Sequence, residues 1–90
     1  MDKYDYMILD VIQTHKQQFG SNMRLSELEN TFWKRIENDE ALNIGQARIG
    51  ERVTQLYIDD LIQNKDGYSL TRKGKEVLSF HAVASYSVAS

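Results

Sequence analysis

Apolar residues recur at helical spacing through most of the chain, and this periodicity restricts the fold to a mainly helical one. The first such segment is bounded by acidic residues at its start and by Gly20 at its end, which suits the two ends of a helix dipole. It predicts a helix from about Lys3 to Gln18. Its inward face is expected to consist of Tyr4, Ile8, Val11, Ile12, His15 and Phe19.

A second helix is indicated by a capping signal. Ser26 and Glu29 have the spacing of a capping box, in which each side chain accepts a hydrogen bond from the backbone N–H of the other residue. The helix is therefore predicted to begin at about Glu27, and its apolar spacing ends near Ile36. An acidic, turn-prone segment, Asn38 to Asn43, follows.

The third helix is predicted as one continuous segment, with Asn43 as its cap and Leu61 at its end. Gly45 and Gly50 weaken it, and close packing against another helix or a ligand would explain why they are tolerated. Its inward side is expected to hold Ile49, Val53, Leu56 and Tyr57.

A turn signal then interrupts the helical pattern. Asp66 and Gly67 can adopt positive φ between two very short apolar runs, which predicts a β-hairpin. Thr71 is expected to cap a fourth helix. We therefore expect a single, mainly α domain with a short hairpin over residues 1–84, followed by a frayed, serine-rich tail over residues 85–90.

Composition argues against several classes of activity. The chain has no cysteine, no apolar run long enough to span a bilayer, and two distant histidines, His15 and His81. The segment Gly45–Gly50 has phosphate-loop spacing, but Glu51 and Arg52 replace the required lysine and hydroxyl. We therefore expect no enzymatic activity, metal, cofactor, small-molecule substrate or membrane contact, and a cytoplasmic location.

The polar side of the third helix is more informative. At about 100° per residue, Arg48, Arg52 and Gln55 share one stripe opposite the apolar side. Arginine can donate two hydrogen bonds to guanine, and glutamine can pair in a similar way with adenine. An ordinary solvated helix face is the alternative interpretation, because charged outer faces are usual on surface helices.

Charge is unevenly distributed along the chain, although its formal net value is only −2. Four bases and one acid lie between Lys65 and Lys75, whereas five acids and two bases lie between Ser26 and Leu42. Three of those bases stand at a predicted helix start, where the helix dipole disfavours them. A phosphate backbone would favour them, so the pattern indicates a local nucleic-acid footprint.

The run from Gly67 to Leu78, Gly-Tyr-Ser-Leu-Thr-Arg-Lys-Gly-Lys-Glu-Val-Leu, is similar to the segment that closes the wing and opens the next helix in winged helix-turn-helix DNA-binding regulators. The stretch from Leu25 to Leu28 resembles the start of that family's second helix, and Ile49 to Leu61 resembles its recognition helix. The resemblance covers Tyr4 to about Leu78. It implies a winged helix-turn-helix fold, with a three-helix core and a C-terminal helix.

The resemblance also implies a function. It suggests a small stand-alone transcriptional regulator that binds double-stranded DNA sequence-specifically, with the third helix in the major groove and the short wing on the phosphate backbone. Together with the basic cluster, it gives as candidate DNA contacts Gln46, Arg48, Arg52, Gln55, Lys65, Arg72, Lys73 and Lys75. The chain departs from the family in a longer interval between Ser26 and Ile49 and in a very short wing.

A homodimer is expected because one short module contacts few phosphates. Its candidate interface consists of apolar residues on the first and last helices: Tyr4, Met7, Val77, Phe80, Val83 and Ala84. The alternative is that Phe80 completes the core of the monomer. The alternative function is a winged-helix protein–protein interaction module that has lost DNA binding and uses the acidic segment or the Trp33 surface, since the family includes such members.

Overall fold

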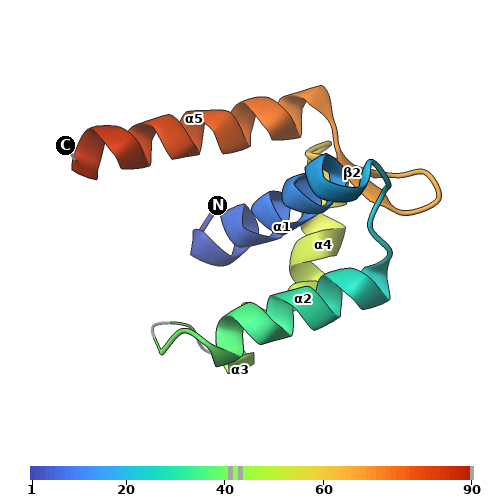
Figure 1. Ribbon diagram of the computed structural model, residues 1–90, viewed down its shortest axis with the longest axis horizontal. Helices are drawn as coiled ribbons and strands as arrows, with labels where there is room; N and C mark the ends of the chain where they lie inside the picture. The colour runs from blue at the N-terminus through green and yellow to red at the C-terminus, as the bar shows by residue number, and fades with distance from the viewer. Residues whose placement is uncertain (41, 43, 90) are drawn as a thin grey trace.

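Helices and one two-stranded hairpin make up the part of the chain that the computed structural model describes, which is residues 1–40, 42 and 44–89 (Figure 1). For residues 44, 46 and 82–89 the description is limited to the backbone. The elements follow in the order α1 (Lys3–Phe19), α2 (Leu25–Glu37), α3 (Ile44–Ala47), α4 (Ile49–Ile58), β1 (Ile62–Asn64), β2 (Tyr68–Leu70) and α5 (Arg72–Ala89). The predicted mainly helical class with a short hairpin is confirmed.

Both ends of α1 are formed by the residues that the sequence indicates. The Asp2 carboxylate accepts hydrogen bonds from the backbone N–H groups of Tyr4 at 3.0 Å and Asp5 at 3.3 Å, and the Asp5 carboxylate accepts from the Asp2 N–H at 3.0 Å. Gly20 ends the helix at φ 68°, and its N–H donates to the Lys16 carbonyl at 2.8 Å. These caps satisfy backbone groups that a helix end leaves without partners.

The start of α2 differs from the prediction. The helix begins at Leu25, so Ser26 lies inside it, and the Glu27 carboxylate accepts from the Arg24 N–H at 3.4 Å. The predicted cap at Ser26 is therefore wrong. Met23 is paired with β2, and the chain turns into the helix immediately after that contact.

The predicted continuous third helix is also wrong. The chain breaks at Arg48, which has φ 44°, and α3 and α4 lie on either side of it. In an unbroken helix Ala47 and Ile49 would project about 200° apart. The break allows both side chains to be buried in the core. The second segment ends at Ile58, three residues earlier than expected.

The hairpin has the predicted turn. Asp66 and Gly67 adopt φ 53° and φ 117°, and the Gly67 N–H donates to the Asn64 side-chain oxygen at 3.2 Å. Met23 extends the antiparallel pairing, because its N–H donates to the Tyr68 carbonyl at 3.0 Å and its carbonyl accepts a hydrogen bond from the Tyr68 N–H at 2.7 Å. The hairpin is therefore attached to the segment that leads into α2.

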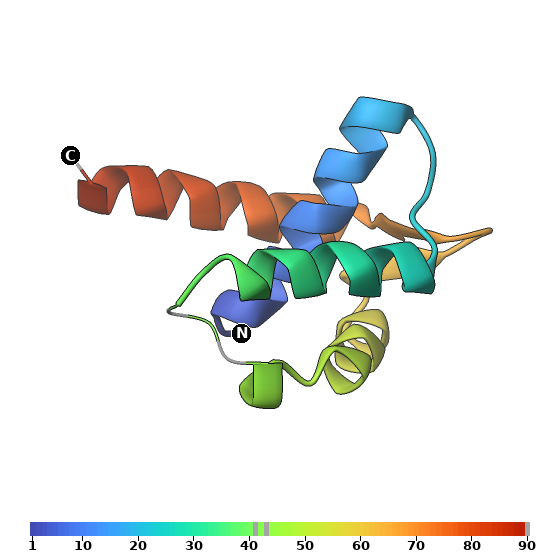
Figure 2. The same cartoon turned by 60° about the horizontal axis from the view of Figure 1, so that its bottom comes forward.

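The core is organised around α1, which contacts α2, α4, α5 and β2. Figure 2 shows α1 crossing between α5 and α2. The most completely buried side chains include Ile8, Leu9, Ile12, Leu28 and Phe32. Burial of each such side chain stabilises the fold by about 1.5–3 kcal/mol. Two predicted inward residues, Phe19 and Tyr57, are instead exposed, and each lies in the last turn of its helix.

The last helix is fixed at its start. The Thr71 hydroxyl accepts from the Gly74 N–H at 3.0 Å, which confirms the predicted cap. Gly74 is buried against Leu61, and a Cβ at this position would overlap the Leu61 carbonyl group. The backbone of α5 is helical through Ala89, including residues 85–89, which the sequence predicts to be frayed.

Among the described residues, none of the helices combines the length and the apolar character that crossing a bilayer requires.

Candidate nucleic-acid interface

Arg48 lies at the break between α3 and α4, and its side chain is 70% exposed. Its guanidinium lies 3.7 Å from the Glu51 carboxylate, one turn further along α4. An ion pair between two exposed side chains contributes little stability. Arg48 can therefore exchange Glu51 for an external anion at small cost.

Arg52 is bound by groups of the protein itself, and these contacts compete with its predicted contact in the major groove. Its guanidinium contacts the carboxylates of Asp2 at 2.7 Å and Asp5 at 3.3 Å, and its Nε donates to the Ala47 carbonyl. It also lies over the Tyr4 ring, 5.0 Å from the ring centroid, and its side chain is only 19% exposed. Arg52 thus joins α4 to the start of α1.

The electrostatics of this contact favour the charged forms of Asp2 and Arg52. Partial burial acts to raise the pKa of Asp2, but hydrogen bonds from Asp5 and Arg52 and the Arg52 charge outweigh burial and lower that pKa. Burial acts to lower the pKa of Arg52, and the hydrogen bonds and charges of Asp2 and Asp5 raise it. The carboxylates of Asp2 and Asp5 therefore pair with the guanidinium that the sequence predicts to contact DNA.

The outer face of α4 is polar at its centre and apolar at its end. The Gln55 amide donates to the Asp59 carboxylate at 3.1 Å, and both side chains are exposed. Tyr57, which the sequence places inward, is 56% exposed, and Ile58 is exposed beside it. The sequence gives no local signal for this exposure, because it predicts a helix that continues to Leu61, whereas α4 ends at Ile58.

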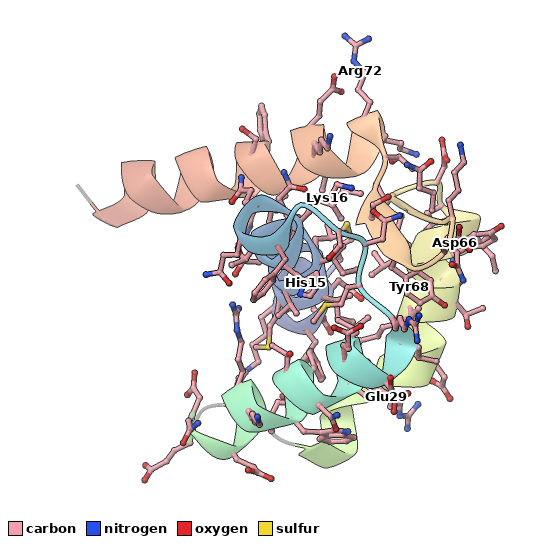
Figure 3. All side chains as sticks on the ribbon, turned by 45° about the vertical axis from the view of Figure 1, so that its right-hand side comes forward. His15, Lys16, Glu29, Asp66, Tyr68 and Arg72 are labelled. Atoms are coloured by element: carbon pink, nitrogen blue, oxygen red, sulfur yellow. The ribbon has the colours of Figure 1, made fainter. Side chains whose placement is uncertain are left out.

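A groove separates α4 from the hairpin. It has a volume of about 370 Å³ and is lined by Val53, Thr54, Tyr57, Asn64 and Tyr68. Figure 3 shows Tyr68 on the hairpin, with Asp66 at its tip. The groove therefore places the side of α4 that carries Thr54 and Tyr57 next to the hairpin.

The hairpin tip carries one candidate cation. Lys65 is exposed, and its side chain forms no ion pair with any described residue. Its carbonyl accepts a hydrogen bond from the Asn22 side chain at 2.7 Å, which fixes the turn against the segment before α2. Arg24 follows the paired residue Met23 and is also exposed, so it is a second cation beside the hairpin that the sequence pattern did not single out.

The basic cluster at the start of α5 does not form one surface with Arg52. The Lys73 ammonium donates to the Asp59 carbonyl at the end of α4, whereas Arg52 contacts the region where α4 begins. Arg72 is 94% exposed and lies 3.3 Å from Glu76. Figure 3 shows Arg72 pointing away from the body of the protein and from Asp66 at the hairpin tip. These cations therefore do not converge on one surface.

Arg72 and Lys75 instead line a hollow of about 660 Å³ on α5, together with Glu76, Ser79 and Phe80. These two bases are thus neighbours of an exposed aromatic side chain. They are separated from Lys73, which lies on the side of α5 that meets the end of α4.

The acidic segment after α2 lies far from the hairpin. Figures 1 and 2 both place its described part at the opposite end of the molecule from the hairpin tip. Its carboxylates therefore do not repel a ligand bound at that tip. Trp33, the other proposed protein-binding residue, is half-buried and packs against the core.

The remaining predicted site residues are those of the candidate dimer interface, together with Gln46. Tyr4 is 3% exposed, so its predicted place in a dimer interface is wrong, and Met7 and Val77 are partly buried against the core. Phe80 is 79% exposed, so it does not complete the core of the monomer. The side chains of Gln46, Val83 and Ala84 lie outside the described ones.

Comparison of the chain with protein-family models, with curated proteins and with solved structures found no match.

Proposed function

We propose that this chain is a winged helix-turn-helix protein that binds double-stranded DNA through α4 and the β-hairpin. The order of elements supports the proposal, since helices, a hairpin and a last helix follow one another as the sequence resemblance implies, apart from the break at Arg48. The pairing of Met23 with Tyr68 supports it further, because it attaches the hairpin to the segment before α2.

The observation that carries the proposal is that α4 has exposed polar side chains and lies beside the hairpin. With ten residues, α4 is about 15 Å long and has a diameter suited to the major groove, which is about 12 Å wide. Arg48 and Gln55 are exposed on this helix, and a groove lined by Thr54 and Tyr57 separates another side of it from the hairpin. Gly50 is exposed with open space around its Cα, so a DNA backbone can approach closely there.

The contacts divide by chemistry. Arg48 and Gln55 are the candidates for base edges, because arginine and glutamine can each form two hydrogen bonds to one base. Lys65 and Arg24 are the candidates for phosphates, which fix position and supply most of the salt-dependent affinity. Arg52 supports α4 from behind and takes no part in binding.

The test is a titration of fluorescent duplex DNA followed by anisotropy at several salt concentrations. We expect the double variant Arg48→Ala/Lys65→Ala to lose at least about tenfold in affinity and to lower the salt slope by about 1, because Lys65 is its one phosphate contact. The matched control is Arg72→Ala/Lys75→Ala, which also removes two exposed cations but from α5. It is expected to retain nearly all binding. Equal losses in both double variants contradict the proposed surface.

A protein-binding module is the second candidate, favoured by the exposed apolar end of α4. Tyr57 and Ile58 face solvent beside the groove, where water-exposed apolar side chains are typical of protein interfaces. If the wild-type chain fails to bind any duplex at low salt, this candidate replaces the first. A titration with random-sequence duplex decides between them.

A further inference from the structure

The second half of α5 extends beyond the rest of the molecule. Figures 1 and 2 both show the end of this helix projecting past α1 and α2. From Ser79 to Ser90 the sequence contains no aspartate, glutamate, lysine or arginine. A projecting helical segment without charged residues is unusual, because solvated helix faces normally carry them.

Such a segment has little reason to be helical on its own. It contains four serines and two valines, which have lower helix propensity than its three alanines, and isolated helices of this length are marginal in water. Tertiary packing normally provides the missing stability. The projecting end of α5 therefore calls for a partner surface.

Phe80 marks where that partner would contact the helix. It is the most exposed of the large apolar side chains in the described part of the chain. Two hollows flank it, one lined with Arg72 and Lys75 and the other with Tyr6 and His81. The Tyr6 and His81 rings are stacked with centroids 3.7 Å apart, which joins α1 to α5 beneath this surface.

We propose that α5 pairs with α5 of a second copy of this chain, in antiparallel orientation and centred on Phe80. This pairing goes beyond the proposed function and does not depend on DNA binding. Phe80 lies at the middle of the 18-residue helix, which is about 27 Å long, so an antiparallel pair overlaps along its full length. A two-fold axis at this point brings the two Phe80 side chains together.

The charge distribution favours this orientation and this occupant. In an antiparallel pair, the basic first half of each helix lies along the uncharged second half of the other. A parallel pair would place Arg72 and Lys75 next to their own copies. A lipid surface is a poor alternative, because interfacial helices carry lysine and arginine on their polar face and this half of α5 has neither.

The first test measures association by sedimentation over a wide concentration series. One helix per protomer buries less than the roughly 800 Å² per partner of a standard interface, so we expect a weak dimer. Phe80→Asp is expected to raise the dimer dissociation constant by at least about tenfold. The matched control is Phe19→Asp, which alters a 68% exposed phenylalanine on α1. This control should leave the dimer dissociation constant unchanged.

Circular dichroism of each variant confirms that it is folded before it is compared. A wild-type chain that stays monomeric at every concentration overturns the proposal. So does a folded Phe80→Asp variant that associates as strongly as Phe19→Asp.

The second test determines orientation and uses the absence of cysteine in the natural sequence. Single variants Ser79→Cys and Arg72→Cys are treated with a short bis-maleimide. Antiparallel pairing brings the two copies of residue 79 together and separates the two copies of residue 72 by about 24 Å along the axis. Efficient crosslinking of Ser79→Cys alone supports the proposal, and equal crosslinking of Arg72→Cys contradicts it.

Discussion

The guanidinium of Arg52 contacts two carboxylates, a backbone carbonyl and the face of an aromatic ring. Helical periodicity places this residue on the same stripe as Arg48, and in the sequence the two arginines look equivalent. They differ because Asp2 and Asp5, about fifty positions earlier, lie next to one of them in the fold. A long-range contact of this kind leaves no signal in local spacing.

Replacement of the two arginines separates their roles. We expect Arg52→Ala to lower the free energy of unfolding by about 1–2 kcal/mol, because it removes partly buried hydrogen bonds to charged groups. Arg48→Ala is expected to change it by less than about 0.5 kcal/mol, since its one ion pair is exposed. Urea denaturation measures both values, and equal losses would show that Arg52 is not a structural contact.

The lowered pKa of Asp2 makes the same contact depend on pH. A carboxyl group whose pKa is lower in the folded state stabilises the fold above its unfolded value, here 3.8, and loses that contribution as pH falls through the folded pKa. We therefore expect the stability difference between wild type and Asp2→Asn to be largest above about pH 4 and to shrink at lower pH. Urea denaturation at a series of pH values checks this, and parallel curves contradict it.

Among the elements, most of those predicted from local signals agree with the structure, and the cap at Ser26 is an exception. The caps of α1, the positive φ angles of Asp66 and Gly67, and the Thr71 cap of α5 each depend on a few adjacent residues. The break at Arg48 does not depend on adjacent residues alone, because it allows Ala47 and Ile49 on its two sides to be buried in the core. The start of α2 is set by the pairing of Met23 with β2, which is another contact between distant segments.

Glycines in two helices show how differently the same residue can be used. The sequence pattern predicts close packing of Gly45 and Gly50 against another helix or a ligand. Outside the backbone of its own helix, no described atom lies within 4 Å of a Cβ built at Gly50, so no other helix packs there, and the close approach is found at Gly74. We expect Gly74→Ala to destabilise the fold by about 1–3 kcal/mol through overlap with Leu61. Gly50→Ala should be neutral or stabilising by up to about 1 kcal/mol. Thermal unfolding compares them, and a stable Gly74→Ala variant would contradict the packing of α5.

For the whole molecule, the distribution of charge is more informative than its total. The sequence correctly locates bases around the hairpin and the start of α5, but it treats them as one group. The structure separates the hairpin cation Lys65 from Arg72, which points away from the hairpin tip, and from Lys73, which contacts the end of α4. It also places the acidic segment far from the hairpin. The direction of each charge depends on packing that the linear pattern does not contain.

The most direct test of the account is a chemical-shift map of the isotopically labelled chain during titration with duplex DNA. We expect the largest changes in the backbone amides of α4, of the turn at residues 65–67 and of Arg24. The amides of Arg72 and Lys75 should change little. Changes concentrated at the start of α5, or none at saturating duplex, would contradict the proposed interface.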